Sequence, residues 1–331
     1  MRVAFETLHG VLAASLRKAG MAEDRAGTCA RLFAEASRDG VASHGLNRFP
    51  RFLRMIARGI VDVAATPARV TAAGALERWD GRRGPGNLNA RDAMDGGMAL
   101  ARSHGIGCIA LANTNHWMRG GSYGWQAADA GMIGVCWTNT QPNVPPWGAA
   151  DPRIGNNPLV LAVPRRDGHI VLDMALSQFS VGAMAAYAAR GDALPVAGGY
   201  DEGGTLTQDP AAILASRRLL PIGFWKGSGL AFALDLIAAA LAAGQATHQI
   251  SQDPEEETGL SQVFIAIDPA SLGSDGDTSR IADAALEHLI AGPGTVRYPG
   301  AGTLAIRARS LRDGVEVDPA IWTEVQASAA G

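Results

Sequence analysis

Cysteine is scarce in this sequence of 331 residues. The three cysteines, Cys29, Cys108 and Cys136, are widely spaced, and each lies in an apolar stretch. An odd number of cysteines without a CxxC pair supports neither a disulfide framework nor a cysteine-based metal site. We therefore expect reduced thiols, as in a cytoplasmic protein.

The sequence also lacks an excess of one charge and a long apolar run. Its 29 Lys and Arg residues against 32 Asp and Glu give a net charge of -3, without the basic face that follows nucleic-acid phosphates. The most apolar segment, residues 230–243, is shorter than the ~20 residues that cross a bilayer, and it contains Asp235. The N-terminus has no long apolar core of a signal peptide. We expect a soluble protein that binds neither nucleic acid nor membrane.

Several catalytic and cofactor motifs are absent as well. The sequence contains no HExxH, no paired Cys/His spacing and no GxSxG, so a zinc protease or a serine hydrolase is not indicated and no metal is expected. The nearest approach to GxGxxG is Gly227-Ser228-Gly229, which lacks the third glycine. Ordinary Rossmann binding is therefore disfavoured. Lys226 beside a helix start would still form an anion site.

Glycine, in contrast, is abundant: 41 residues of 331, where a typical content is ~7%. No collagen period or low-complexity segment accounts for it, so we expect many tight turns and close backbone approaches. At roughly 150 residues per domain, the length fits about two domains.

Hydrophobic spacing predicts an α/β fold. Leu8, Leu12 and Leu16 recur at helical spacing, and the first 60 residues are expected to be helical. Short apolar runs between helices are typical of buried strands. Leu230, Leu234, Ile237 and Leu241 are expected to place one helix face in the core. Strands are predicted over residues 108–112, 132–138, 159–163, 170–174 and 263–267, and helices over residues 90–103 and 122–130.

Two glycine-rich segments, residues 80–89 and 197–210, look like boundaries. We expect an N-terminal helical region over residues 1–80, a central α/β domain over 81–304 and a C-terminal helical segment over 305–331 that packs against the first region. The loop at 197–210 is expected to be a lid or a partner contact.

Two histidines have neighbours that suit chemistry on an oxo acid. His44 precedes Arg48 by four residues between two predicted helices, and His116 follows a predicted strand. A histidine can donate a proton near neutral pH, and an arginine fork can bind a carboxylate. His9, His104, His248 and His288 lie on predicted helices or their ends, where a structural or surface role is the simpler interpretation.

Several motifs, in one order along nearly the whole chain, resemble the malate/L-lactate dehydrogenase family of the second type. This family's nicotinamide-binding fold is not of the Rossmann kind, and the resemblance implies a central mixed sheet flanked by a helical region from both chain ends. The stretch Trp117-Met118-Arg119 resembles a subfamily that reduces sugar-derived acids. The motifs are Ser43-His44-Gly45 with Arg48, Asn115-His116, residues 142–148, Gly155-Asn156-Asn157-Pro158, Leu172-Asp173-Met174-Ala175, and residues 220–223 with Lys226-Gly227.

The resemblance implies a reductase that uses NADH or NADPH, with NADH favoured, and a homodimer. His44 would donate the proton as an imidazolium, Ser43 would orient it, and Arg48 would hold the substrate carboxylate. His116, Trp117 and Arg119 would contact the substrate. The cofactor contacts implied are His169, Ile170, Val171, Leu172, Asp173, Met174, Ala175, Trp225, Lys226, Gly300, Ala301 and Gly302.

The substrate class implied is a 2-oxo or 2,3-diketo sugar acid. Alternatives within the family are 2-hydroxy acid dehydrogenases of the malate, L-lactate or ureidoglycolate type and reductases of cyclic imino acids. The alternative from another class is a catalytically silent dimeric binding protein. The chain departs from the family at Asn156, where Thr is common, and at Ala301-Gly302, where an acidic residue often follows Pro299-Gly300.

Overall fold

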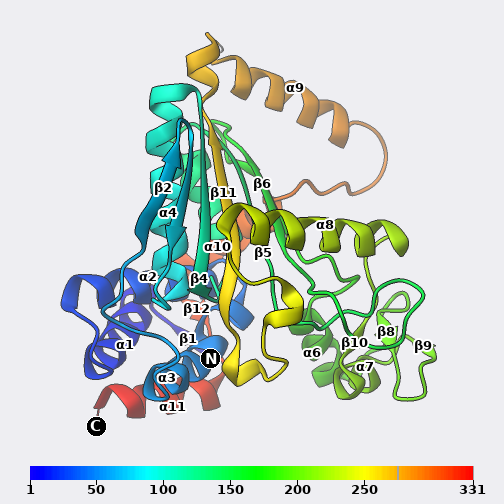
Figure 1. The fold of residues 1–331 in the computed structure, drawn as a ribbon. Helices are drawn as coiled ribbons and strands as arrows, with labels where there is room; N and C mark the ends of the chain where they lie inside the picture. The colour runs from blue at the N-terminus through cyan, green and yellow to red at the C-terminus, as the bar shows by residue number, and fades with distance from the viewer. Residues whose placement is uncertain (274–275, 331) are drawn as a thin grey trace.

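A seven-stranded mixed sheet forms the centre of the computed structural model, which describes residues 1–273 and 276–330 (Figure 1). Every neighbouring pair is antiparallel except β3 and β4, which α4 (Gly86–His104) connects in a parallel crossover. The strands follow the order β2 (Ala68–Ala73), β3 (Leu76–Asp80), β4 (Ile106–Asn115), β11 (Thr258–Ile267), β5 (Ile133–Thr138), β6 (Leu159–Val163) and β7 (Ile170–Met174). The mixed sheet expected from the sequence is confirmed, and so are the five predicted strands.

Helices cover both faces of this sheet. Side chains along a strand alternate between the two faces, so each strand contributes to the core on either side. On β11, Phe264 and Ala266 point to the core under α4 and α5 (Gly121–Asp129), whereas Val263 points to the core under α8 (Trp225–Ala242). The second half of β11 is thus apolar on both sides, which explains why residues 263–267 are a continuous apolar run.

The two ends of the chain build one helical lobe. Helix α1 packs on α2 and on α11, and β1 (Arg2–Val3) pairs with β12 (Val315–Glu316), so both ends of the chain contribute to this lobe. Two strands of the central sheet, β2 and β3, come from the 1–80 stretch that the sequence assigned to helices. The lobe consists of α1 (Phe5–Lys18), α2 (Glu23–Arg38), η1 (Ala42–His44), η2 (Leu46–Arg48), α3 (Phe49–Ala57) and α11 (Pro319–Ala330).

A second lobe lies across from the N-terminal helices (Figure 1). Part of the loop predicted as a lid or a partner contact, residues 197–210, belongs to its small sheet of β8, β9 and β10. The lobe contains α6 (Val181–Arg190), β8 (Gly199–Tyr200), β9 (Leu206–Thr207), α7 (Pro210–Ser216) and β10 (Arg218–Leu219). The remaining elements are η3 (Thr247–Gln249), η4 (Pro254–Glu256), η5 (Pro269–Leu272), α9 (Asp277–Ile290) and α10 (Ala301–Asp313).

Helix α8 departs from its sequence prediction. Leu234 is buried, but Leu230 and Ile237, expected on the same core face, are 40% and 45% exposed. Phe232 and Leu236 are exposed too, so the helix has an apolar face that none of the described residues covers. In the described part of the chain, α8 alone is long and apolar enough to cross a membrane, a test that a core helix also passes. Its buried Asp235 accepts hydrogen bonds from Asn139 and from the Thr247 backbone.

Candidate active site

Two histidines from distant segments lie side by side at the edge of the helical lobe. His44 is the last residue of η1, His116 directly follows β4, and their ring centroids are 5.6 Å apart with planes at 22°. The Met118 backbone N–H donates to His116 Nδ1 at 3.0 Å, which leaves the His116 proton on Nε2. Ser43 Oγ lies 3.1 Å from His44 Nδ1. The residues predicted separately from sequence therefore form one group.

Glycines without room for a side chain fix the backbone beside both histidines. A Cβ at Gly45 would lie 2.2 Å from Ser37 Oγ, and a Cβ at Gly86 would lie 2.3 Å from the His116 carbonyl oxygen. Neither glycine has a positive φ. Close approach of neighbouring atoms therefore requires glycine at both positions, and any larger residue would displace the His44 or His116 segment.

Burial and neighbouring positive charge keep both imidazoles neutral. Desolvation, reinforced by Arg48 and then Arg119, lowers the pKa of His44 to about 4. Desolvation and the charge of Arg48 likewise lower the pKa of His116 well below its usual range. The imidazolium expected at His44 is therefore not its resting form at neutral pH, because the charged ring would stand in a desolvated site next to a guanidinium.

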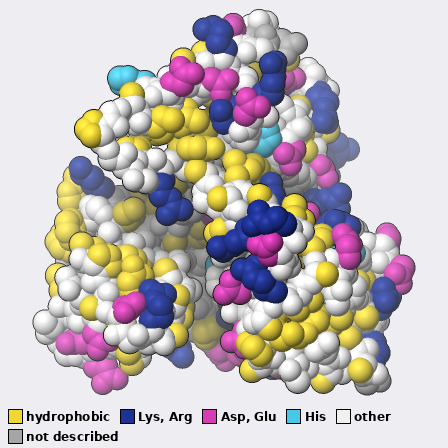
Figure 2. Space-filling view, turned by 180° about the vertical axis from the view of Figure 1, so that it is seen from behind, with side chains coloured by type: hydrophobic (Ala, Val, Ile, Leu, Met, Phe, Trp, Pro, Cys, Tyr) yellow, Lys and Arg dark blue, Asp and Glu magenta, His cyan; other side chains and the backbone are white. Residues whose placement is uncertain are grey.

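Protein surrounds the two histidines closely, although the site itself opens to solvent. Ser43 is exposed and His44 half-buried, although surrounding protein is dense enough to shift the His44 pKa. Gly182, in the first turn of α6 in the opposite lobe, comes so close that a Cβ there would lie 2.8 Å from Ser43 Oγ. Figure 2 shows the molecule hollowed between its two lower lobes. The group thus lies where the two lobes meet.

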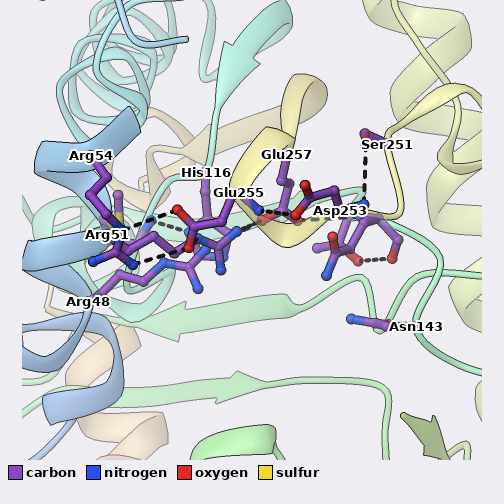
Figure 3. A network of polar contacts seen from close by, with 12 residues as sticks. Arg48, Arg51, Arg54, His116, Asn143, Ser251, Asp253, Glu255 and Glu257 are labelled. Carbon is purple, nitrogen blue, oxygen red and sulfur yellow. Dashed lines mark hydrogen bonds and ion pairs between the residues drawn. The ribbon is translucent and has the colours of Figure 1, made fainter. Parts of the chain in front are cut away.

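An arginine and glutamate cluster adjoins the histidines (Figure 3). Arg48 Nη2 donates to Glu257 Oε2 at 3.4 Å, and Arg51 Nη2 lies 3.9 Å from the same oxygen. Glu255 bonds mainly with Arg54 on the exposed side, at 3.2 Å. Arg48 is close enough to His116 for its charge to lower the His116 pKa, and it retains further N–H donors for a ligand.

Arg119, predicted to contact substrate, is held in a buried ion pair. Its Nη1 donates to Asp39 Oδ2, and Arg307 donates to both Asp39 oxygens at 2.9 and 2.7 Å. Although desolvation alone would raise it, hydrogen bonds from Arg307 and Arg38 hold the pKa of Asp39 far below its ordinary value. The side chain of Arg119 therefore anchors the loop after His116 to α2 and α10, and its charge reaches His44 only through space.

Trp117 also differs from its sequence prediction. The indole is 1% exposed and packs against Tyr123 and Phe264 at centroid distances of 5.7 and 5.9 Å. The Tyr123 hydroxyl donates to the Trp117 carbonyl at 2.5 Å. The structure thus places Trp117 in the core under α4 and α5, where its apolar surface stabilises the loop that carries His116.

The segments predicted to bind the cofactor meet along one strand. The Val171 N–H of β7 donates to the Pro299 carbonyl, so the turn of Gly300, Ala301 and Gly302 lies at the start of the strand. Beyond its end, Ile222 donates to the Leu176 carbonyl, which places the turn before Trp225 and Lys226 there. The strip formed by these three segments is called the β7 strip below.

Side chains of the β7 strip divide between the core and the open side. Val171 is buried, and His169 is held by Asp129, 2.9 Å from its Nε2, and by the Arg165 N–H. Asp173 is exposed, yet surrounding protein raises the pKa of its carboxyl group, and Oδ2 accepts the Gly121 N–H at 2.8 Å. Ile170, Leu172, Met174 and Ala175 are half-buried.

The β7 strip fits a dinucleotide. In the described chain β7 pairs only with β6, so its outer backbone groups are available apart from the Val171 N–H, which donates to Pro299. Helices α8 and α10 begin at the two ends of the strip without a side-chain cap on their first N–H groups, and such groups bind phosphates. Gly300 has no side chain, so the space stays free where a Cβ would lie 3.0 Å from the His169 carbonyl oxygen. Exposed Trp225 and Lys226 add an aromatic face and a cation.

The sequence motifs did not reveal Arg51, Glu257 or Asp39. A signal for two of them exists: Arg48, Arg51, Arg54 and Arg58 recur at helical spacing, and an acidic run ends at Glu257. Nothing in the pattern shows that these segments pair across 209 positions of sequence. No group of three or more His, Cys, Asp or Glu residues forms a metal site within the described ranges.

Residues 3–326 match the model of the malate/L-lactate dehydrogenase family, and the chain belongs to this family of oxidoreductases. It is 45% identical over 336 aligned positions to the 2,3-diketo-L-gulonate reductase of Salmonella paratyphi A, covering 99% of this chain and 100% of that protein.

Solved structures agree with this membership. A putative malate/lactate dehydrogenase from E. coli is 29% identical with a TM-score of 0.92, covering 99% of this chain and 94% of the other. The delta1-piperideine-2-carboxylate reductase of Pseudomonas syringae is 30% identical with a TM-score of 0.88, covering 99% of both chains. The fold and the family predicted from the sequence are thereby confirmed.

Proposed function

We propose that the protein is an NAD(P)H-dependent reductase of 2-oxo and 2,3-diketo sugar acids, with 2,3-diketo-L-gulonate as substrate and 3-dehydro-L-gulonate as product. The observation that carries this proposal is the stacked pair of His44 and His116 beside Arg48. A proton donor and a carboxylate-binding cation thus adjoin each other at an open site. The full-length relative named for this reaction supports the choice of substrate.

Each residue has a distinct task in this proposal. A bound reduced nicotinamide supplies hydride to the substrate ketone. Arg48 binds the substrate carboxylate, and His44 gives a proton to the carbonyl oxygen as negative charge develops there. Ser43 Oγ, 3.1 Å from His44 Nδ1, orients the ring so that Nε2 faces the substrate. The bound carboxylate offsets the charge of Arg48 and thereby raises the His44 pKa, so substrate binding itself favours protonation.

NADH is the cofactor that we favour over NADPH, and the β7 strip is its proposed site. The role of the Ala301-Gly302 turn in this site is limited to backbone contacts, since neither residue has a polar side chain. A cyclic imino acid is the second candidate substrate, because the solved reductase named for delta1-piperideine-2-carboxylate has the same fold.

The chain is also proposed to form a homodimer. The exposed apolar face of α8 supports this, since Phe232, Leu236 and Ile237 are 45–53% exposed on one helix. Exposed apolar patches of this kind mark protein interfaces. A cytoplasmic location remains a prediction from the three unpaired cysteines, whose thiol pKa values burial raises.

Replacing His44 by Ala tests this function. His44→Ala is expected to lower turnover at least ~100-fold, because a positioned proton donor contributes about that much. NADH affinity, measured by nicotinamide fluorescence, should stay within about twofold, since the ring acts on the substrate. Exposed His248 provides the matched control, and His248→Ala should keep normal turnover. Near-normal turnover of His44→Ala would exclude His44 as proton donor, and failure of the wild-type protein to bind either cofactor would favour a silent binding protein.

A further inference from the structure

One buried carboxylate joins three segments of the proposed site. Asp39 directly follows α2 with its side chain 1% exposed, and His44 comes after it in the next element, η1. Asp39 Oδ2 accepts a hydrogen bond from Arg119, which lies in the loop that follows His116. Both Asp39 oxygens accept hydrogen bonds from Arg307 of α10, the helix that begins at one end of the β7 strip. The His44 segment, the His116 loop and α10 therefore meet at one side chain.

The connection between Arg307 and Asp39 consists of two hydrogen bonds. Arg307 Nε and Nη2 donate to the two carboxylate oxygens at 2.9 and 2.7 Å. The same guanidinium lies 4.4 Å from the centroid of the Trp125 ring, and that ring lies 5.6 Å from the ring of His169 in the β7 strip. Two parallel hydrogen bonds fix an angle as well as a distance. The pair therefore sets how α10 is oriented towards α2 and the β7 strip.

Neighbouring contacts of α10 are apolar and lack this directionality. A Cβ at Gly40, the residue after Asp39, would lie 2.9 Å from Ile306 Cδ1. A Cβ at Gly168 would lie 2.5 Å from Leu304 Cδ1. Side chains of α10 thus pack directly on the backbone of two other segments, but apolar contacts are not directional. The ion pair with Asp39 therefore determines where the first N–H groups of α10 point.

The connection between Arg119 and Asp39 acts on the opposite half of the site. Arg119 is 5% exposed, and Asp39 is the only hydrogen-bond partner of its side chain among the described residues. The residue before it, Met118, donates its backbone N–H to His116 Nδ1 at 3.0 Å and so orients that ring. A buried guanidinium that loses its carboxylate is strongly destabilised. Loss of the pair would therefore displace the Met118 N–H and release the His116 ring.

We infer that Asp39 is a positioning residue for both halves of the proposed reaction. Through Arg119 it holds His116 in place for the substrate, and through Arg307 it holds α10 in place for the cofactor. Asp39 itself is buried and acts only through its arginine partners. This inference rests on the proposed function, in which His116 contacts the oxo acid and the β7 strip binds NADH. The two arginines are therefore expected to affect different steps.

Arg307→Met tests the connection to the cofactor. Without the pair, NADH must fix the orientation of α10 as it binds, so the Kd of NADH should rise ~10-fold. Nicotinamide fluorescence measures this Kd, and kcat at saturating NADH should stay within about twofold. Arg312 provides the matched control on the same helix, because its side chain is 71% exposed and pairs with neighbouring Asp313. Arg312→Met should keep the wild-type Kd, and an unchanged Kd in Arg307→Met would overturn the inference.

Arg119→Met tests the connection to the substrate. A released His116 ring binds the oxo acid less well, so KM for 2,3-diketo-L-gulonate should rise ~10-fold while the Kd of NADH stays within about twofold. Arg119→Lys keeps the charge and a donor for Asp39, and it should recover part of the loss. A wild-type KM in Arg119→Met, or equal changes of KM and Kd in both methionine variants, would overturn the inference.

Asp39→Asn should combine both defects, raising the Kd of NADH and the KM of the oxo acid together. Each arginine variant leaves Asp39 paired with Arg38 and with the other arginine, so both can be measured even if Asp39→Asn does not fold. Lower thermal stability with unchanged Kd and KM in every variant would overturn the inference and leave the proposed function intact. A wild-type protein that binds neither cofactor and reduces no oxo acid would overturn both.

Discussion

At the scale of single residues, the neutral resting form of His44 is central. A proton donor that is uncharged before the substrate binds must take up a proton, and in the proposed reaction the substrate carboxylate at Arg48 favours that uptake. The surrounding positive charges act in the opposite sense until then, since Arg48 and Arg119 both lower the His44 pKa. Buried Arg119, although bound to Asp39, thus still contributes to the site through its charge.

The lowered pKa predicts the sign of the pH dependence. The fraction of protonated His44 in the free protein decreases as pH rises above about 4. Because the pH dependence of kcat/KM reflects the pKa values of the free protein, kcat/KM for reduction should fall over the same range. For oxidation, which needs the neutral ring, kcat/KM should rise to a plateau above the same pH. The break in kcat should lie at higher pH, since bound substrate offsets Arg48. Initial rates in both directions measure this, and a break in kcat/KM near the ordinary histidine value of ~6.5 would contradict it.

At the scale of elements, α8 has two functions in the structure. Its inner side packs on β11, β4 and β5, and its first turn lies at one end of the β7 strip. No described residue of the chain covers its outer apolar face. Sequence periodicity did not predict this, because an apolar residue is compatible with both a core and an interface. A dimer contact on this helix would therefore lie close to the proposed cofactor site.

A charge on the exposed face of α8 tests the dimer. The wild-type protein should have about twice the 34.3 kDa mass of one chain by light scattering. Leu236→Glu, at a position 46% exposed, should give single chains, because it places a charge in an apolar contact. Leu311 on α10 is 58% exposed and serves as control, so Leu311→Glu should remain dimeric. A wild-type protein of single-chain mass, or an unaltered Leu236→Glu, would refute a dimer through α8.

At the scale of the whole molecule, local sequence patterns predicted individual strands, but they did not predict how distant segments pair. The five apolar runs gave β4, β5, β6, β7 and β11, because strands buried in an α/β protein form short apolar runs. Strand β2 was missed, since nearly all its residues are exposed and it has no apolar run. The position of β11 between β4 and β5 joins segments far apart in sequence, and no local signal encodes it. The same holds for Glu257 beside Arg48, whereas His44 and His116 were found from their own short motifs.

The central claim is that one site, shared by the His44–His116 pair and the β7 strip, reduces a hydroxylated oxo acid. Its most direct test is the initial rate of nicotinamide oxidation with four substrates, each measured with NADH and with NADPH: 2,3-diketo-L-gulonate, pyruvate, oxaloacetate and delta1-piperideine-2-carboxylate. We predict the highest kcat/KM for 2,3-diketo-L-gulonate with NADH, by at least ~10-fold over the others. An equal or higher kcat/KM for pyruvate, oxaloacetate or the imino acid would contradict the account.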